Sequence, residues 1–314
     1  MIRIFLIFLL ISFSLFAETI LLKSVKVKGS ILDFVVRDDR IYFATDKSKV
    51  LVYDKDLNKL EEIKVRKIKN FLDELIDSDI YSVDEIDKKV LLLAQAEDGY
   101  SELFIFKNGK LEKVLDKSLK LYAKAAKFID KNRVLLALMS DDVVIFDINL
   151  KKIICKKSVG EYFFSTMAID ATRTRAVIGD EGGEVVVVNT KKCDIEKRFV
   201  DINKDKILAL YIANNLVAAG GRDKKLVIYN LDNKSYKFLK GEFFVYVTSI
   251  SPGGTLVAYA DNEKYDIKVV EYPTFNRISI LSGHKNIINK IIFLDENILI
   301  SVSEGGEIYK WRLK

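Results

Sequence analysis

The amino-acid sequence predicts an all-β fold, a seven-bladed β-propeller formed by one continuous domain. Three observations predict it: a repeat near forty residues, four strand-like segments in each repeat, and a spare strand ahead of the first repeat. With 49% hydrophobic and 31% charged residues, the 314-residue chain can bury a sizeable core. It has only 2 prolines and no linker rich in Pro, Gly or Ser, which favours a single domain.

The N-terminal segment, residues 1–17, is typical of a secretory signal peptide. A short start with one arginine precedes the apolar run Ile4–Phe16, and Ala17 comes directly before the first acidic residue. The run is shorter than the roughly 20 residues of a spanning helix. We therefore expect residues 18–314 to form an exported, periplasmic protein without a membrane span. An uncleaved anchor is the alternative, because Leu15, three residues before the cut, is not small.

Seven strongly apolar runs define the repeat. Each ends in a large or branched residue that is followed by a polar one. The intervals between these final residues are 53, 40, 42, 41, 41 and 41. The seven residues are Tyr53, Phe106, Phe146, Val188, Tyr229, Val270 and Trp311. Five of the six intervals agree within two residues, which indicates seven copies of one structural unit.

Each apolar run belongs to a set of four strand-like segments. A second apolar run and a tight polar turn precede it, as in residues 216–230, and a third strand lies before them, as in 247–260. A more polar strand follows, as in 234–240. Four strands in forty residues make one propeller blade. The last repeat ends without a fourth strand, so we expect residues 19–27 to pair with it and close the ring.

The longer first interval places extra residues in blade two, at 69–80 and 96–102. The first insert is acidic and could add a short helix beside the loops that connect the blades. Loops inserted on a rigid scaffold often carry function, but an insertion that is merely tolerated explains the same residues. Its acidic residues are Asp73, Glu74, Asp77 and Asp79.

The last repeat resembles a WD40 repeat. The residues that carry the resemblance are Gly283-His284, Ser301, Ser303 and Trp311, with "SPGG" at 251–254 as an inner turn and Asp223 where the family places a turn aspartate. The likeness extends over most of the chain and is strongest in its last third.

The resemblance implies a hydrogen-bonded network of His284, Ser301 or Ser303, and Trp311. Gly305 stands where the family's aspartate is expected in this blade, so we expect the network to be incomplete. This explains the one histidine of the chain as part of the scaffold. A catalytic or metal-binding histidine would need partners, and no second histidine exists.

Two other glycine-led loops occupy the slot of Gly283-His284 and carry glutamate followed by aromatic residues. They suggest a partly exposed rim that recognises a protein partner. The alternative is that these aromatic rings pack between blades. The candidate partner surface comprises Glu161, Tyr162, Phe163, Phe164, Arg222, Asp223, Glu242, Phe243 and Phe244.

Two cysteines, Cys155 and Cys193, form neither a CxxC nor a CxxCH motif, which gives no support to thioredoxin-like chemistry or covalent haem. Export permits a disulfide, and two free thiols on neighbouring blades are the alternative. The formal charge of +6 is spread among acidic residues, without the dense basic run that nucleic-acid binding needs.

These observations predict a non-catalytic, monomeric interaction scaffold without a metal or cofactor. The alternative is a propeller enzyme or electron-transfer protein with a centrally bound cofactor, for which the chain offers almost no ligand set. The signal-like start "MIRIFLIFLLISFSLFA", the lysine-rich repeats and the last repeat, which ends in "EIYKWRLK", together make the chain similar to the NapL-type accessory proteins of periplasmic nitrate reductases. That similarity implies a role in maturation or assembly, with components of the reductase as partners.

Overall fold

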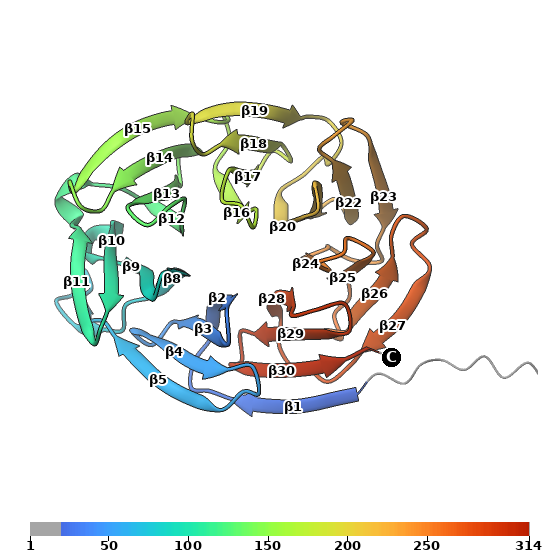
Figure 1. The fold of residues 1–314 in the computed structure, drawn as a ribbon, viewed down its shortest axis with the longest axis horizontal. Helices are drawn as coiled ribbons and strands as arrows, with labels where there is room; N and C mark the ends of the chain where they lie inside the picture. The colour runs from blue at the N-terminus through green and yellow to red at the C-terminus, as the bar shows by residue number, and fades with distance from the viewer. Residues whose placement is uncertain (1–19, 314) are drawn as a thin grey trace, which may run out of the picture.

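The computed structural model describes residues 20–313 as seven four-stranded antiparallel sheets arranged in a ring (Figure 1). The predicted all-β, seven-bladed propeller is confirmed. The expected signal peptide, residues 1–17, lies outside the described residues. In blades 1 to 6 the strands follow one another from the axis outwards, each paired with the next.

Blades 1 to 3 come from the first half of the chain. Blade 1 contains β2 (Ile31–Arg37), β3 (Arg40–Thr45), β4 (Lys49–Asp54) and β5 (Lys59–Lys64). Blade 2 contains β8 (Ile80–Ile86), β9 (Lys89–Gln95), β10 (Ser101–Lys107) and β11 (Lys110–Leu115). Blade 3 contains β12 (Ala123–Phe128), β13 (Arg133–Leu138), β14 (Asp142–Asp147) and β15 (Lys152–Ser158).

Blades 4 to 6 repeat this pattern. Blade 4 contains β16 (Phe164–Ile169), β17 (Arg175–Asp180), β18 (Val185–Asn189) and β19 (Asp194–Phe199). Blade 5 contains β20 (Ile207–Ala213), β21 (Leu216–Gly221), β22 (Lys225–Asn230) and β23 (Tyr236–Lys240). Blade 6 contains β24 (Val247–Ile250), β25 (Leu256–Ala260), β26 (Ile267–Glu271) and β27 (Arg277–Leu281).

Blade 7 joins the two ends of the described chain. Its inner strands are β28 (Ile288–Phe293), β29 (Ile298–Ser303) and β30 (Glu307–Arg312), and its outer strand is β1 (Ile20–Lys26). β1 pairs antiparallel with β30, from Ile20 opposite Arg312 to Lys26 opposite Glu307. The predicted closure of the ring by the N-terminal strand is therefore confirmed, and β1 covers an edge that would otherwise be open.

The insert before blade 2 is a β-hairpin of β6 (Ile68–Lys69) and β7 (Leu75–Ile76), so the expectation of a short helix was wrong. The reason is local: Asn70 Oδ1 accepts hydrogen bonds from the backbone N–H groups of Leu72 and Glu74, at 2.9 and 3.0 Å. Such an Asx turn favours a tight reversal over a helix. Two short 3₁₀ helices lie in other loops, η1 (Glu97–Gly99) and η2 (Lys117–Leu119).

Strand alternation divides the loops between two faces. The connections between blades and the turns between second and third strands emerge together on what we call the upper face. The remaining turns form the lower face. This follows from antiparallel pairing within every blade.

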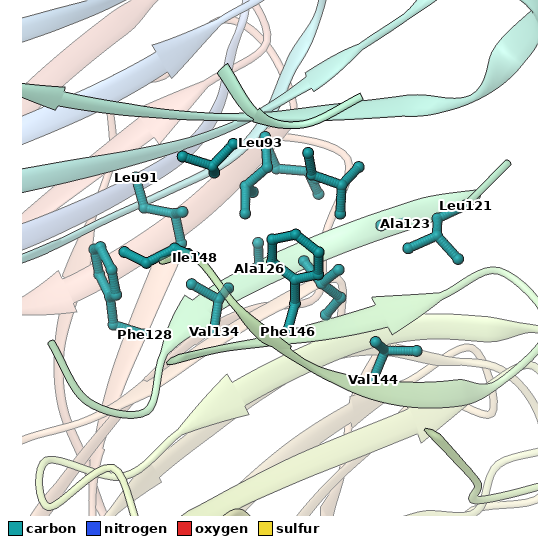
Figure 2. Packing of buried hydrophobic residues seen from close by; sticks show 14 of the residues in the cluster. Leu91, Leu93, Leu121, Ala123, Ala126, Phe128, Val134, Val144, Phe146 and Ile148 are labelled. Carbon is teal, nitrogen blue, oxygen red and sulfur yellow. The ribbon is translucent and has the colours of Figure 1, made fainter. Parts of the chain in front are cut away.

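The core is divided into seven apolar clusters, one between each pair of neighbouring blades. Figure 2 shows the cluster between blades 2 and 3, where Leu91 and Leu93 face Phe128, Phe146 and Ile148. Middle strands are buried on both faces because blades pack face to face. Outer strands have one covered face only, which explains their predicted polar character, as in β15.

Candidate functional site

The upper end of blade 7 contains a buried chain of hydrogen bonds. Trp311 Nε1–H donates to Ser301 Oγ at 2.8 Å, and Ser301 Oγ lies 2.6 Å from His284 Nε2. His284 Nδ1 lies 3.3 Å from Glu307 Oε2, which also accepts from Ser303 Oγ at 2.8 Å. Since indole N–H can only donate, the chain is satisfied when neutral His284 carries its proton on Nδ1.

The expectation that this network lacks a carboxylate was wrong. Gly305 leaves the aspartate position empty, but Glu307, two residues later, supplies the carboxylate from the start of β30. Burial lowers the pKa of His284 to about 4, which the Glu307 carboxylate only partly offsets. The ring of Tyr309 stacks on the imidazole with centroids 4.4 Å apart. His284 is therefore a buried, neutral, fully partnered side chain with a structural role.

Blade 5 contains a second version of this network, which sequence analysis missed. Tyr229 Oη donates to Asn203 Oδ1 at 2.8 Å, and Asn203 Nδ2 donates to Asp223 Oδ1 at 3.1 Å. Asp223 also accepts from the backbone N–H of Lys204 at 2.9 Å. Asn203 lies about two repeats before His284, so the repeat spacing was the available signal. Asp223 was expected on a partner surface, but this network turns its largely buried carboxylate inward.

The innermost strands around the axis are joined by a buried ionic cluster. Asp33 on β2 pairs with Lys127 on β12 at 2.7 Å and with Lys290 on β28 at 2.5 Å. Ser82 on β8 donates to the same carboxylate at 3.1 Å. Burial raises the pKa of Asp33, but the two lysines outweigh it and hold that pKa well below its usual range. One carboxylate thus links blades 7, 1, 2 and 3.

A second buried carboxylate, Asp84 on β8, links blades 1 to 4. It pairs with Arg37 on β2 at 2.8 Å and with Arg173, from the lower turn of blade 4, at 2.5 Å. It also accepts from the backbone N–H of Phe128 at 2.9 Å. Burial raises the pKa of Asp84, but the cationic partners hold it below its usual range. The partners lie too far apart in the sequence for local patterns to indicate this cluster.

The candidate partner surface is only partly exposed. Tyr162 and Phe163 are 56% and 58% exposed in the connection between blades 3 and 4. Phe164 is 9% exposed because it begins β16 and turns into the interface between blades 3 and 4, so its expected place on the surface was wrong. Glu161 is exposed beside them. Any Cβ on Gly182 would overlap the Tyr162 ring, so this ring packs closely against the backbone of the neighbouring loop.

The equivalent loop between blades 5 and 6 is less exposed. Phe243 and Phe244 are half-buried, and their tilted rings pack against each other with centroids 4.4 Å apart. The guanidinium of exposed Arg222 lies 5.7 Å from the Phe244 ring centroid, within cation–π range. Exposed Glu242 forms an ion pair with Lys268 at 2.9 Å. These residues belong to the upper face, but Tyr162 and Phe163 offer more apolar surface.

Exposed apolar side chains are distributed unequally between the two faces. In the structure of residues 20–313, Leu150 is the one large apolar side chain exposed in the lower turns. The upper face has many, and Phe71 at the tip of the β6–β7 hairpin is 95% exposed. The upper-face set comprises Phe71, Leu72, Leu75, Leu119, Tyr122, Met139, Tyr162, Phe163, Val200 and Ile287.

The charges are also divided. The loops of the upper face hold 20 acidic and 13 basic side chains, although the whole chain has a formal charge of +6. The outermost strands of the blades hold 5 acidic and 14 basic side chains. An acidic upper face is therefore surrounded by a basic perimeter.

Two buried carboxylates lie close together under the upper face, at the junction of blades 3 and 4. Asp141 and Asp180 are 1% and 2% exposed, and Gly160 lies between them. Asp141 Oδ1 and Asp180 Oδ2 have no hydrogen-bond partner. Burial raises the pKa of Asp141 to about 7, and the charge of Asp180 adds to this effect. The pKa of Asp180 is raised too, chiefly by burial.

Cys155 on β15 and Cys193 in the lower turn of blade 4 form a disulfide with Cα atoms 6.6 Å apart. It crosslinks the outer edges of blades 3 and 4. Within residues 20–313, no group of three or more His, Cys, Asp or Glu side chains is arranged to hold a metal ion. Nor does the described part of the chain contain a helix long and apolar enough to cross a membrane.

No protein-family model matches the chain, and no curated protein matches its sequence. The geometry of the site is therefore the basis for a functional conclusion.

Proposed function

We propose that this protein is a non-catalytic interaction scaffold whose upper face binds a protein partner. The observation that carries the proposal is the unequal distribution of exposed apolar side chains between the two faces. A concentration of exposed apolar side chains on one face of a folded protein favours an interaction site on that face. Aromatic residues contribute most to such sites because they bury a large area with few rotatable bonds.

Tyr162 and Phe163 are the best candidates for anchor residues. Both are exposed by more than half, and the packing of Tyr162 over Gly182 fixes its ring before a partner arrives. A side chain that is already ordered loses less conformational entropy on binding. The excess of acidic groups in the surrounding loops favours a partner with a basic surface, which these charges would also attract from a distance.

We further propose that the protein acts in the periplasm. Support comes from the signal-like pattern of residues 1–17 and from the disulfide of Cys155 and Cys193, which is typical of oxidising compartments. Components of a periplasmic nitrate reductase are the first partners to test, on the basis of the similarity to NapL-type and WD40-type proteins described above.

The decisive experiment is capture of nitrate reductase components from periplasmic extract by the immobilised protein. The double variant Tyr162→Ser/Phe163→Ser should capture at least tenfold less of any partner than the wild type, with an unchanged melting temperature. Tyr236→Ser/Phe238→Ser is the matched control, because it removes one tyrosine and one phenylalanine of similar exposure from β23 on the perimeter. Equal capture by both double variants would show that the upper face is not the binding site.

An absorbance spectrum of the purified protein tests the cofactor alternative. The scaffold proposal expects only the absorption of aromatic side chains and the disulfide. A visible band that persists through purification would overturn the non-catalytic assignment.

A further inference from the structure

The outer edge of blades 3 and 4 carries a basic patch with exposed aliphatic side chains at its centre. Residues 150–158 contain four lysines and no acidic residue. β15 pairs with β14 on one side only, so its other edge faces outwards. Between Cys155 and Ile153 the pairing register shifts, which breaks the alternation of the strand and leaves Ile153 and Ile154 exposed together, at 39% and 47%. Leu150, 61% exposed, precedes them.

The disulfide brings further lysines to this edge. Cys193 directly follows Lys191 and Lys192, both exposed, and its bond to Cys155 holds them beside β15. Among the described residues, Lys152, Lys191 and Lys192 form no ion pair. Other lysines of β15 form exposed pairs, such as Lys157 with Asp194 at 2.9 Å. Exposed pairs of this kind hold their partners weakly, so these lysines stay available.

We infer that this patch binds the surface of an anionic phospholipid bilayer. The aliphatic side chains can enter the headgroup boundary while the surrounding lysines attract anionic headgroups, the combination that gives peripheral proteins their membrane affinity. A protein partner fits less well, because interface cores are depleted in lysine and enriched in aromatic residues and arginine. The patch contains no aromatic residue. Nucleic acid fits less well for the same reason, since bases stack on aromatic rings.

Lysines on an edge strand also discourage edge-to-edge pairing of sheets. That role alone does not explain the patch, because β5 and β19 protect the same kind of edge with mixed charges, as in Lys59–Lys64 and Asp194–Phe199. Neither of those strands combines lysines without acidic residues with two adjacent exposed isoleucines, as β15 does.

The patch faces sideways and leaves the upper face free. A protein held at a bilayer through blades 3 and 4 would present its upper face roughly perpendicular to the membrane plane. The inference does not depend on the proposed partner, because it concerns different side chains.

Vesicle co-sedimentation tests the inference with the purified chain. Vesicles of phosphatidylcholine with about a third phosphatidylglycerol should bind the wild type at low salt, and vesicles of phosphatidylcholine alone should bind at least tenfold less. Lys152→Gln/Lys191→Gln/Lys192→Gln should lower the partition coefficient on anionic vesicles at least tenfold, since each lysine near an anionic surface contributes appreciably to binding. Ile153→Ser/Ile154→Ser should lower it severalfold without a change in salt dependence.

The matched control is Lys234→Gln/Lys237→Gln/Lys240→Gln, which removes the same charge from β23 and its preceding turn in blade 5. It should keep most of the binding. Equal loss in both triple variants would overturn the inference in favour of attraction by net charge. Absence of binding to anionic vesicles would also overturn it. Self-association of the wild type that the β15 variants abolish would assign the patch to a contact between two copies instead.

Discussion

Blade 7 and the junction of blades 3 and 4 both bury polar side chains, but they differ in how these side chains are partnered. In blade 7, His284, Ser301, Ser303 and Glu307 satisfy one another, and the described strands of the blade are joined to the rest of the ring without a disulfide. At the junction of blades 3 and 4, two carboxylates lie buried with unpaired oxygens, and a disulfide crosslinks the outer edge.

The difference shows where the ring accommodates the free-energy cost of burying unpaired polar groups. Buried polar groups are stabilising only when they are partnered, and an unpartnered carboxylate destabilises the folded state. A disulfide can offset such a cost in the overall stability, because it lowers the conformational entropy of the unfolded chain. The closure of the ring has no disulfide, so it depends on non-covalent contacts such as the pairing of β1 with β30 and the ion pair of Lys290 with Asp33.

Removal of β1 should have the largest effect. A chain that begins at Gly29 loses the whole pairing between β1 and β30 and uncovers an apolar edge beside Ile308 and Trp311. We expect a loss of several kcal/mol, a large part of the usual total of about 5–15 kcal/mol. Thermal unfolding should be compared with a chain that begins at Glu18. Equal melting temperatures would show that β1 is dispensable for closure.

Loss of the disulfide should have the next largest effect. Cys155 and Cys193 are 38 residues apart, and a crosslink over such a loop contributes about 2–4 kcal/mol. Denaturant midpoints should fall in dithiothreitol for the wild type. The variant Cys155→Ala/Cys193→Ala should already be lowered and should not respond to the reductant. A wild type that is equally stable when reduced would contradict the prediction.

Ser301→Ala tests the satisfied network of blade 7. It leaves the buried Trp311 indole N–H and His284 Nε2 without their shared partner, which should cost about 1–3 kcal/mol. Ser282→Ala, an exposed serine in the preceding loop, is the control and should change little. If both variants unfold at the same denaturant concentration, the network does not contribute to stability.

Asp141→Asn should change stability least, and its effect should differ most clearly between pH 8 and pH 4. The folded-state pKa of Asp141, about 7, lies above its unfolded value of 3.8. Its stabilising contribution is therefore complete below about pH 4 and is lost as pH rises towards 7. The variant should gain about 1–2 kcal/mol at pH 8, since it removes a buried charge but still buries an amide, and little at pH 4. Exposed Asp39→Asn is the control.

His284 should respond to pH in the opposite direction. Burial lowers its pKa from 6.5 to about 4, so the unfolded state binds a proton first and stability falls as pH drops from about 6.5 to 4.

For Asp141→Asn, a gain in stability that is the same at pH 4 and pH 8 would show that the charge of Asp141 is not the cause.

Much of the architecture was predictable because the signals are periodic. Apolar runs such as those ending at Tyr229 and Trp311 recur at the blade spacing, and an incomplete last blade requires a strand from elsewhere. Glu307 was missed because its carboxylate reaches back from the next strand to the site of a missing aspartate. Asn203 was missed because a different residue type fills the histidine slot. Phe164 was misplaced because one step from loop to strand turns a side chain from solvent into the core.

The ionic clusters were beyond the reach of local patterns. Asp33 and Lys290 meet only once the ring has closed, and Arg173 reaches Asp84 across blade 3. The exposed fraction of a side chain also depends on residues far away in the sequence. This is why Tyr162 and Phe243, in two similar loops, differ in exposure in the folded protein.

The pairing of β1 with β30 also sets an order of assembly. β1 is the first strand of the ring to be made and its partner β30 is the last, so β1 must wait until all seven blades have been made before it can pair. Until then the partly made ring exposes the faces of blades 1 and 7. Contacts between such distant segments form late and slowly. Removing the residues of β30 would therefore do more than delete the contacts of one strand. It would also prevent the pairing with β1 that covers the exposed faces of blades 1 and 7.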